Sequence, residues 1–236
     1  MNSAVLIPVY NNVRTIRDVA SRAILQGLPV IVVDDGSTDG SGASLEGLEI
    51  TLLTHKKNLG KGMALKTGFE YARKAGYGRV VTLDGDGQHY PEDIPLLEEA
   101  SALEPRALVV GSRDLPSLHL SKGSAFANRF SNFWFKVQTL RSLPDTQTGL
   151  RSYPLERLPG IFSARYEAEL ALLVFSAWKG IPLVPVPIRV LYPEDRVSSF
   201  KPVRDFSRIS LLNVCLCLLA VVYGYPRMLL GKICGR

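Results

Sequence analysis

Cysteine is scarce in this sequence and stands only near its end. The 236 residues include three cysteines, Cys215, Cys217 and Cys234. Zinc sites use cysteines and histidines at regular spacings, whereas Cys215 and Cys217 lie in an apolar run with no histidine nearby. We therefore expect buried free thiols in a reducing compartment, and neither a zinc site nor a disulfide framework.

Three short signals that often identify a protein class are also missing. The first residues, MNSAVLIPVY, have no basic segment and too short an apolar run for a signal peptide, so we expect a strand there. PVYNN stands where a G-x-G-x-x-G would follow that strand, and no G-x-x-x-x-G-K-[ST] occurs. These absences argue against a dinucleotide-binding Rossmann site and against a P-loop.

Positive charge is in excess. The sequence has 28 lysines and arginines against 22 acidic residues, which gives a net charge of +6. This balance favours an anionic partner such as a nucleotide, a phospholipid surface or a nucleic acid. The length and the 46% apolar content suffice for one α/β domain with a full core.

Apolar runs alternate with segments of helical spacing along the chain. We expect strands at residues 4–9, 29–34, 48–54, 79–83 and 107–113, and helices at 13–26, 61–75, 94–103, 121–140 and 165–179. This alternation predicts a mainly parallel sheet with helices on both faces. A proline-rich strand at residues 181–192 is expected at the edge of the sheet.

Polar loops follow four of the expected strands, at residues 10–12, 34–39, 84–88 and 111–113. Ligands of parallel α/β sheets bind at the carboxyl ends of the strands, so one cleft could collect all four loops. The loop at 34–39, DDGSTD, offers carboxylates to a nucleotide base or ribose, or else forms only a capped turn. In NLGKGMAL, Asn58 and Lys61 stand before a helix, where N–H groups and an ammonium could meet a phosphate.

The segment RVVTLDGDGQHY ends an apolar strand with two aspartates. Asp84 and Asp86 repel each other unless a cation balances their charge, and Gln88 adds a neutral oxygen. Oxygen donors of this kind suit Mg²⁺ or Mn²⁺, which share their ligand shell with phosphates. The alternative is a solvated Asp-Gly turn, but the position beside three other polar loops favours a metal site.

Six segments stand in a characteristic order: IPVYNN, VIVVDDGSTDGS, NLGKGMALKTGF, LDGDGQHYPEDI, VGSR and DTQTGLR. Over about residues 5–201 they resemble the family 2 glycosyltransferases of the GT-A fold, in particular the dolichyl- and polyprenyl-phosphate mannose and glucose synthases. The resemblance implies a Rossmann-like α/β fold for nucleotide-diphospho-sugar transfer, with a mixed, mainly parallel sheet. Many lipid-phosphate members carry SKL where this chain reads RVSSFKP.

The resemblance also implies roles for particular residues. Asp86, Asp145 and Arg113 would be catalytic, and the metal would be held by Asp84, Asp86 and Gln88. The acceptor phosphate would be bound by Arg113, Arg129, Arg196 and Lys201. The donor nucleotide would be bound by Pro8, Tyr10, Asn12, Asp35, Gly36, Ser37, Asn58, Lys61, Asp84 and Gly85.

The implied reaction transfers a sugar from a UDP- or GDP-sugar to a membrane lipid with inversion, most simply to a polyprenyl phosphate. A phosphate acceptor is already ionised and needs only positioning, whereas a hydroxyl acceptor needs a base. Asp145 could position the acceptor or act as that base. Glu167 and Glu169 fit a helix face better than a base, and His89 fits a packing role.

Three other functions remain open from the residues. The same fold could glycosylate a hydroxyl of a glycolipid or saccharide. A nucleotidyltransferase would need a triphosphate loop that PVYNN does not supply, and a non-catalytic membrane scaffold would not need the metal motif. We expect Mg²⁺ or Mn²⁺ as cofactor and no nucleic-acid partner.

The composition of the chain shifts near its end. Residues 209–225 carry no charge, a length at the lower limit for crossing a bilayer, although Asn213 and the following Pro226 interrupt the pattern. This hydrophobic helix could be a short anchor, lie in the membrane interface, or be a core helix or oligomer contact. We expect a catalytic domain over residues 1–202 that faces the cytoplasm, and a membrane-associating segment over 203–236 that could also support a homo-oligomer.

Overall fold

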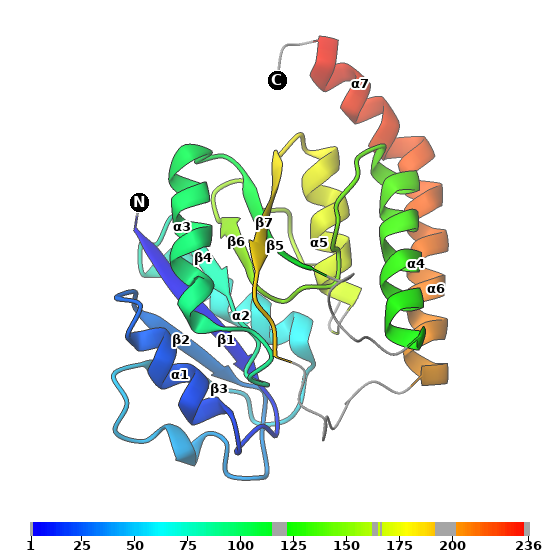
Figure 1. The fold of residues 1–236 in the computed structure, drawn as a ribbon. Helices are drawn as coiled ribbons and strands as arrows, with labels where there is room; N and C mark the ends of the chain where they lie inside the picture. Colours follow the sequence, from blue (N-terminus) through cyan, green and yellow to red (C-terminus); the bar gives the residue numbers. More distant parts are fainter. Residues whose placement is uncertain (1, 115–121, 162–164, 166, 192–201, 234–236) are drawn as a thin grey trace.

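The computed structural model describes residues 2–114, 122–161, 165, 167–191 and 202–233, which contain a seven-stranded sheet (Figure 1). The strand order is β3-β2-β1-β4-β6-β5-β7. Among these strands, β6 alone runs antiparallel to its neighbours. The sheet is therefore mixed and mainly parallel, which confirms the predicted fold class. The bounds are β1 Ser3–Val9, β2 Val30–Asp34, β3 Thr51–Thr54, β4 Arg79–Thr82, β5 Leu108–Arg113, β6 Arg151–Pro154 and β7 Leu183–Ile188.

Helices cover both faces of the sheet, as the alternation of elements predicts. Helices α1 and α3 pack on one face, whereas α2 and α5 pack on the other. Helices α4 and α6 lie side by side against α5, on the outer side of the molecule (Figure 1). The bounds are α1 Ile16–Ile24, α2 Lys61–Lys74, α3 Ile94–Leu103, α4 Lys122–Thr139, α5 Glu167–Trp178, α6 Pro202–Leu219 and α7 Tyr225–Ile233.

The central strand β1 is buried on both faces, which explains its unbroken apolar sequence. Alternate residues serve the two cores: Leu6 faces α2, and Ile7 faces α1. The approach of α2 is close, because a Cβ atom added to Gly68 would lie 2.2 Å from Leu6 Cδ1. Because β1 is packed between helices on both faces, the sheet that carries the polar loops is held in a defined position.

Strand β6 was predicted as a loop, and this prediction was wrong. Its Arg151 and Ser152 look polar in sequence, yet both are buried. The guanidinium of Arg151 donates to the main-chain oxygens of Thr146, Thr148 and Glu169. Since its charge is satisfied by carbonyl groups, the arginine can occupy a core strand that its residue type alone would not suggest.

The predicted edge strand is confirmed, because β7 is the last strand in the order and pairs with β5. Its prolines, Pro185 and Pro187, are exposed there. Helix α1 begins at Ile16, three residues later than predicted, because Val13 and Thr15 form a turn.

The apolar tail is helical throughout its described part, with a π-helical turn at Ala220–Gly224 between α6 and α7. Pro226 does not end the helix: it is the second residue of α7, which directly follows the π-helical turn, where the helical hydrogen-bond pattern already changes. Residues Ile209–Leu230 are long and apolar enough to cross a membrane, with a mean hydropathy of 1.9, and 22% of that window is buried.

Polar contacts attach the inner side of this tail to the rest of the fold. The buried Asn213 of α6 accepts a hydrogen bond of 2.9 Å from Gln138 of α4. The Tyr225 hydroxyl donates to the Val137 carbonyl, and Gly224 lies against Trp178, where an added Cβ would come within 2.5 Å of the indole. The outer side is exposed and includes Cys215, which corrects the prediction that its thiol is buried.

Candidate active site

The polar loops that follow β1, β2 and β4 are joined by hydrogen bonds. Asn11 and Asn12 donate main-chain N–H groups to the hydroxyls of Ser37 and Ser41 at 3.0 and 2.8 Å. The Thr15 hydroxyl donates to the Gly85 carbonyl at 2.7 Å. These strands are neighbours in the sheet, so their loops meet at one edge, as predicted.

Asp84 lies directly after β4 and forms an ion pair with Lys61, the first residue of α2. Lys61 Nζ is 2.7 Å from Asp84 Oδ1 and also 2.7 Å from Glu169 Oε2 on α5. Burial alone would lower the pKa of Lys61, but the two carboxylates outweigh burial and raise it. Burial would raise the pKa of Asp84, but Lys61 holds it below its ordinary value. Asp84 is therefore ionised at neutral pH.

The turn after Asp84 is closed by Asp86, whose Oδ1 accepts the main-chain N–H of Gln88 at 3.0 Å. Gly87 between them has a φ of +76°, a conformation that favours glycine. The carboxylate of Asp84 lies over Gly149, where an added Cβ would come within 2.2 Å of Asp84 Oδ2. Glycine at position 149 thus leaves the room that Asp84 occupies.

The donor set of this turn fits a hard divalent cation. Two carboxylates and the Gln88 amide oxygen are the ligand types that Mg²⁺ and Mn²⁺ prefer, with water and phosphate completing the shell. Within the described part of the chain, no group of three or more His, Cys, Asp or Glu side chains is placed to hold a metal. Among those residues, a metal cage made of protein side chains alone is therefore not formed.

Asp35, after β2, fixes the loop that precedes α2. Its Oδ1 contacts His55 Nδ1 at 2.6 Å and accepts the Leu59 N–H at 2.9 Å, and its Oδ2 accepts the Gly60 N–H at 2.7 Å. The carboxylate is 3% exposed. Asp35 therefore shapes the wall of the predicted nucleoside pocket by holding the 55–60 loop in place.

The other predicted donor residues border the same edge with different exposure. Pro8 is buried in β1, whereas Tyr10 and Asn58 are exposed. Gly36 has a φ of +73° and lies so close to the Lys57 main chain that an added Cβ would come within 2.5 Å. The loops after β2 and before α2 are therefore packed directly on one another.

Arg113, at the end of β5, is paired with Asp145. Its Nε and Nη2 atoms lie 2.5 and 2.9 Å from the two carboxylate oxygens. Asn128 of α4 donates to Asp145 Oδ1 at 2.9 Å, and the Gln147 N–H donates to the same oxygen at 3.0 Å. Burial would raise the pKa of Asp145, but the hydrogen bond from Arg113 lowers it. Asp145 is a fully buried, ionised carboxylate that orients Arg113.

Of the remaining predicted acceptor residues, the structure describes Arg129, which is bonded within its own helix. Arg129 is exposed on α4, where its Nε donates to the Ala125 carbonyl of the same helix. Arg196 and Lys201 lie outside the described residues. His89 is buried beside Thr148, and burial lowers its pKa to about 4, so it is neutral at pH 7. This agrees with the packing role expected for it.

Two residues have a larger place in the site than their sequence context indicated. Glu169 was expected on a helix face, yet its side chain is only 13% exposed and pairs with Lys61. In the sequence, the one signal for Glu169 was a carboxylate close before the apolar run ALLVFSAW. Arg151, in the unpredicted β6, supports the 145–149 loop through the carbonyls of Thr146 and Thr148.

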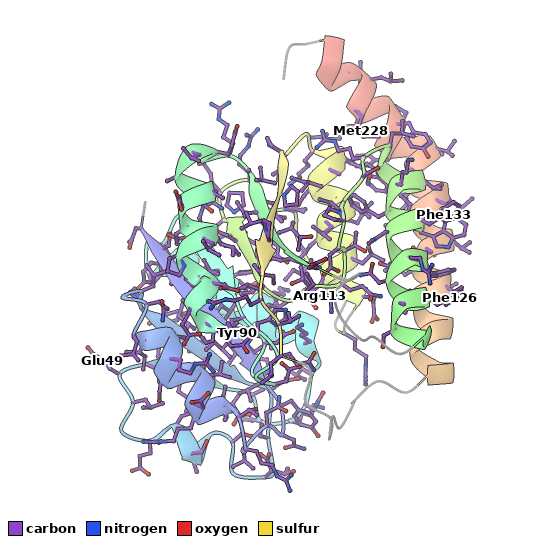
Figure 2. The ribbon with its side chains drawn as sticks, viewed as in Figure 1. Glu49, Tyr90, Arg113, Phe126, Phe133 and Met228 are labelled. Carbon is purple, nitrogen blue, oxygen red and sulfur yellow. The ribbon has the colours of Figure 1, made fainter. Side chains whose placement is uncertain are left out.

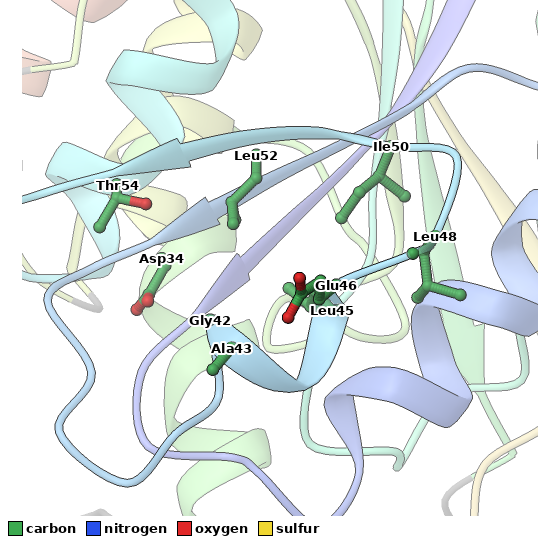
Figure 3. Close-up of a pocket in the computed structure, with 10 residues that line it drawn as sticks. Asp34, Gly42, Ala43, Leu45, Glu46, Leu48, Ile50, Leu52 and Thr54 are labelled. Atoms are coloured by element: carbon green, nitrogen blue, oxygen red, sulfur yellow. The ribbon is translucent and has the colours of Figure 1, made fainter.

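A separate hollow of about 570 Å³ lies beside the edge strand β3 (Figure 3). It is lined by Asp34, Gly42, Ala43, Leu45, Glu46, Gly47, Leu48, Ile50, Leu52 and Thr54. None of the residues predicted to bind donor, metal or acceptor is among them. The predicted site at the ends of β4 and β5 is therefore distinct from this hollow.

The model of a protein family described as Glycosyl transferase family 2 matches residues 4–150, more than half of the chain. The chain belongs to this family. The matched range includes the loops after β1, β2, β4 and β5, and it ends just before β6. The predicted resemblance is thereby confirmed, and this protein is a glycosyltransferase.

Named relatives lie in the branch that the motifs indicated. The polyprenol monophosphomannose synthase of Mycolicibacterium smegmatis is 30% identical over 208 residues, which is 78% of this chain and 75% of that protein. The UDP-N-acetylglucosamine–dolichyl-phosphate N-acetylglucosaminyltransferase of Methanococcus voltae is 26% identical over 215 residues, 80% and 85% of the two chains.

A solved structure shows the same fold. Glucosyl-3-phosphoglycerate synthase from Mycobacterium tuberculosis, in complex with Mn²⁺, UDP and phosphoglyceric acid, superposes with a TM-score of 0.63. Its sequence is 19% identical, and the match covers 93% of this chain and 78% of that one. The α/β architecture of this family 2 glycosyltransferase is therefore the GT-A fold that the motifs predicted.

Proposed function

We propose that this glycosyltransferase uses Mg²⁺ or Mn²⁺ to transfer a sugar, with inversion, from a nucleotide-sugar to a polyprenyl phosphate. The observation that carries the proposal is the turn at the end of β4. There two carboxylates, one already paired with an ammonium, adjoin the loops that are predicted to bind a nucleotide. The M. tuberculosis structure with Mn²⁺ and UDP supports a divalent cation and a diphosphate leaving group.

In this proposal Asp84, Asp86 and Gln88 hold the metal, which when bound offsets the charge that develops on the departing nucleoside diphosphate. Lys61 lies beside Asp84 and supplies a further positive charge to the diphosphate. The packed loops around Asp35 and Gly36 form the wall against which the nucleoside lies.

The environment of Asp145 favours a phosphate acceptor over a hydroxyl acceptor. A general base must have an oxygen available to take a proton, but both oxygens of Asp145 accept hydrogen bonds inside the protein. Asp145 is therefore better suited to orient Arg113, and Arg113 to bind the acceptor phosphate. Such an acceptor is already ionised and needs no base. The two named relatives, whose names state dolichyl phosphate and a polyprenol product, support the same choice.

The apolar outer side of α4, α6 and α7 supports a lipid partner. Phe126 and Phe133 of α4 are 57% and 59% exposed and point away from the sheet (Figure 2). Leu211, Leu218 and Val222 continue this surface on the tail and are 66%, 66% and 74% exposed. We define these residues as the apolar face.

We propose that the apolar face lies in the cytoplasmic leaflet and that residues 203–236 hold the catalytic residues 1–202 at the membrane. Asn213 favours a helix that lies along the leaflet over one that crosses the bilayer. A crossing helix would be surrounded by lipid, whereas Asn213 is bonded to α4 of the same chain.

The test is donor turnover by the purified full chain in detergent. UDP-glucose, UDP-GlcNAc and GDP-mannose are each offered with Mn²⁺ or Mg²⁺, with and without a polyprenyl phosphate. Asp86→Asn should abolish transfer, and Glu49→Gln, at an exposed position far from β4, should leave it unchanged (Figure 2). Donor hydrolysis without transfer to the lipid phosphate would move the assignment to a hydroxyl acceptor such as a glycolipid or saccharide. No turnover of any donor would refute the proposal.

A further inference from the structure

Lys61 bridges two carboxylates that come from different parts of the chain. Asp84 follows β4, Glu169 lies in the first turn of α5, and each is 2.7 Å from Lys61 Nζ. The side chains of Asp84, Glu169 and Lys61 are 24%, 13% and 15% exposed, so the bridge is mostly shielded from water. Ion pairs that are shielded in this way are stronger than those on an open surface.

The bridge is held from both sides by the main chain. Lys61 begins α2 directly after Gly60, whose N–H is bonded to Asp35 and whose φ is +98°. The Asp84 carboxylate lies against Gly149. The Lys61 ammonium already contacts the Oδ1 atom of this carboxylate.

Lys61 occupies one lone pair of Asp84 Oδ1, so a metal that takes this same lone pair displaces the ammonium. The displaced Lys61 would not have to leave, since Glu169 contacts the same Nζ atom independently of Asp84. Glu169 has no other role in the proposed reaction, so this contact gives a reason for its carboxylate at the start of a mainly apolar helix.

We propose that Lys61 and the divalent cation compete for Asp84, and that Glu169 is a positioning residue that retains Lys61 beside the site after displacement. Before the metal binds, the ammonium keeps the Asp84 carboxylate in place and balances its charge. Afterwards, Lys61 stays next to the position of the donor diphosphate. The proposal rests on the metal site of the proposed function and adds the exchange partner and the residue that controls it.

The test is Mn²⁺ binding without nucleotide, measured from the electron paramagnetic resonance signal of free Mn²⁺. Lys61→Gln removes the competitor and should tighten Mn²⁺ binding about tenfold, the scale of one charge-assisted hydrogen bond. Glu169→Gln leaves Asp84 as the sole carboxylate of the bridge and should weaken binding about threefold. In the Lys61→Gln background, Glu169→Gln should have almost no effect, because Glu169 acts through Lys61.

Matched controls lie on the same helix. Lys66 and Glu70 of α2 form an exposed pair, so Lys66→Gln and Glu70→Gln change charge in the same senses away from Asp84. Both should leave Mn²⁺ affinity within about twofold. Lys61→Met provides a second uncharged variant, and thermal unfolding of each protein identifies any variant that does not fold.

Each outcome separates the inference from the proposed function. Mn²⁺ binding that Asp86→Asn abolishes, with Lys61→Gln and Lys61→Met no tighter than wild type, would overturn the exchange and keep the metal site. If Glu169→Gln changes the Mn²⁺ affinity equally in the wild-type and Lys61→Gln backgrounds, Glu169 acts only through its negative charge, and its positioning role is overturned. Wild-type protein that shows no Asp86-dependent Mn²⁺ binding, either without nucleotide or with added UDP, would overturn the metal site and the exchange together.

Discussion

Replacement of Asp145 by asparagine should destabilise the protein strongly, because it removes the negative partner of a buried ion pair. Asp145 is fully buried and accepts hydrogen bonds from Arg113, Asn128 and the Gln147 N–H, and Arg113 is 14% exposed. Breaking a buried pair on one side costs about 3–5 kcal/mol. Because Arg113 keeps slight access to water, we expect a loss near the lower limit, about 3 kcal/mol.

Urea unfolding followed by circular dichroism measures this loss as a lower midpoint at an unchanged slope. Asp18→Asn provides the control, because Asp18 is 67% exposed and its pair with Arg22 should contribute less than about 1 kcal/mol. If Asp145→Asn costs no more than Asp18→Asn, the Arg113–Asp145 pair is not formed as described, and the orientation of Arg113 needs another explanation.

The same pair predicts a dependence of stability on pH. Arg113 holds the pKa of Asp145 below its ordinary value of about 3.9, so the unfolded chain takes up a proton at a higher pH than the folded one. The stabilisation is complete above about pH 5 and is lost as the pH falls through the lowered pKa. The difference between wild type and Asp145→Asn should therefore shrink in acid, and a constant difference would contradict an ionised Asp145.

Two further predictions concern the metal turn and the apolar face. Gly149→Ala should lower transfer activity at least about tenfold. The added Cβ would lie 2.2 Å from Asp84 Oδ2 and would displace that carboxylate. Donor turnover at the wild-type rate would show that this contact does not matter for transfer. The double variant Phe126→Ser and Phe133→Ser should lose most binding to anionic lipid vesicles in flotation, because it removes two exposed aromatic side chains. As a control, Leu103→Ser on α3 removes a leucine that is 79% exposed and should bind vesicles like wild type. Equal losses of vesicle binding in the double variant and in Leu103→Ser would contradict a defined apolar face.

Local pattern was sufficient to predict the elements whose residues follow a simple burial rule. Strand β1 is apolar from Ala4 to Val9 because helices cover both of its faces. Helix α2 was predicted to within one residue of its end, because its apolar spacing and the preceding glycine agree. In such segments propensity, periodicity and turn chemistry favour the same structure.

Strand β6 could not be predicted in this way. The burial of Arg151 depends on three carbonyl groups supplied by other segments, and sequence spacing contains no information on where they lie. Glu169 is a similar case in the site, because its partner Lys61 is on another helix, more than a hundred residues earlier. Contacts that are distant in sequence thus account for the missed strand and the missed side chain.

The tail shows the same limit at the level of a whole helix. Its sequence indicates a hydrophobic segment of nearly spanning length, but not which side is turned to the protein. That side is set by Asn213, which pairs with Gln138, and by Tyr225, whose hydroxyl donates to the Val137 carbonyl. These polar contacts fix the rotation of α6, so that Leu218 and Val222 face outward.

Helix α4 connects the proposed acceptor site to the proposed membrane surface. On its inner side, the buried Asn128 donates to Asp145, and Asp145 orients Arg113. On its outer side, Phe126 and Phe133 are exposed (Figure 2). A polyprenyl phosphate has an anionic head and an apolar tail, and α4 offers a contact for each within one element. The charge that would bind the head and the surface that would receive the lipid are therefore held by the same helix.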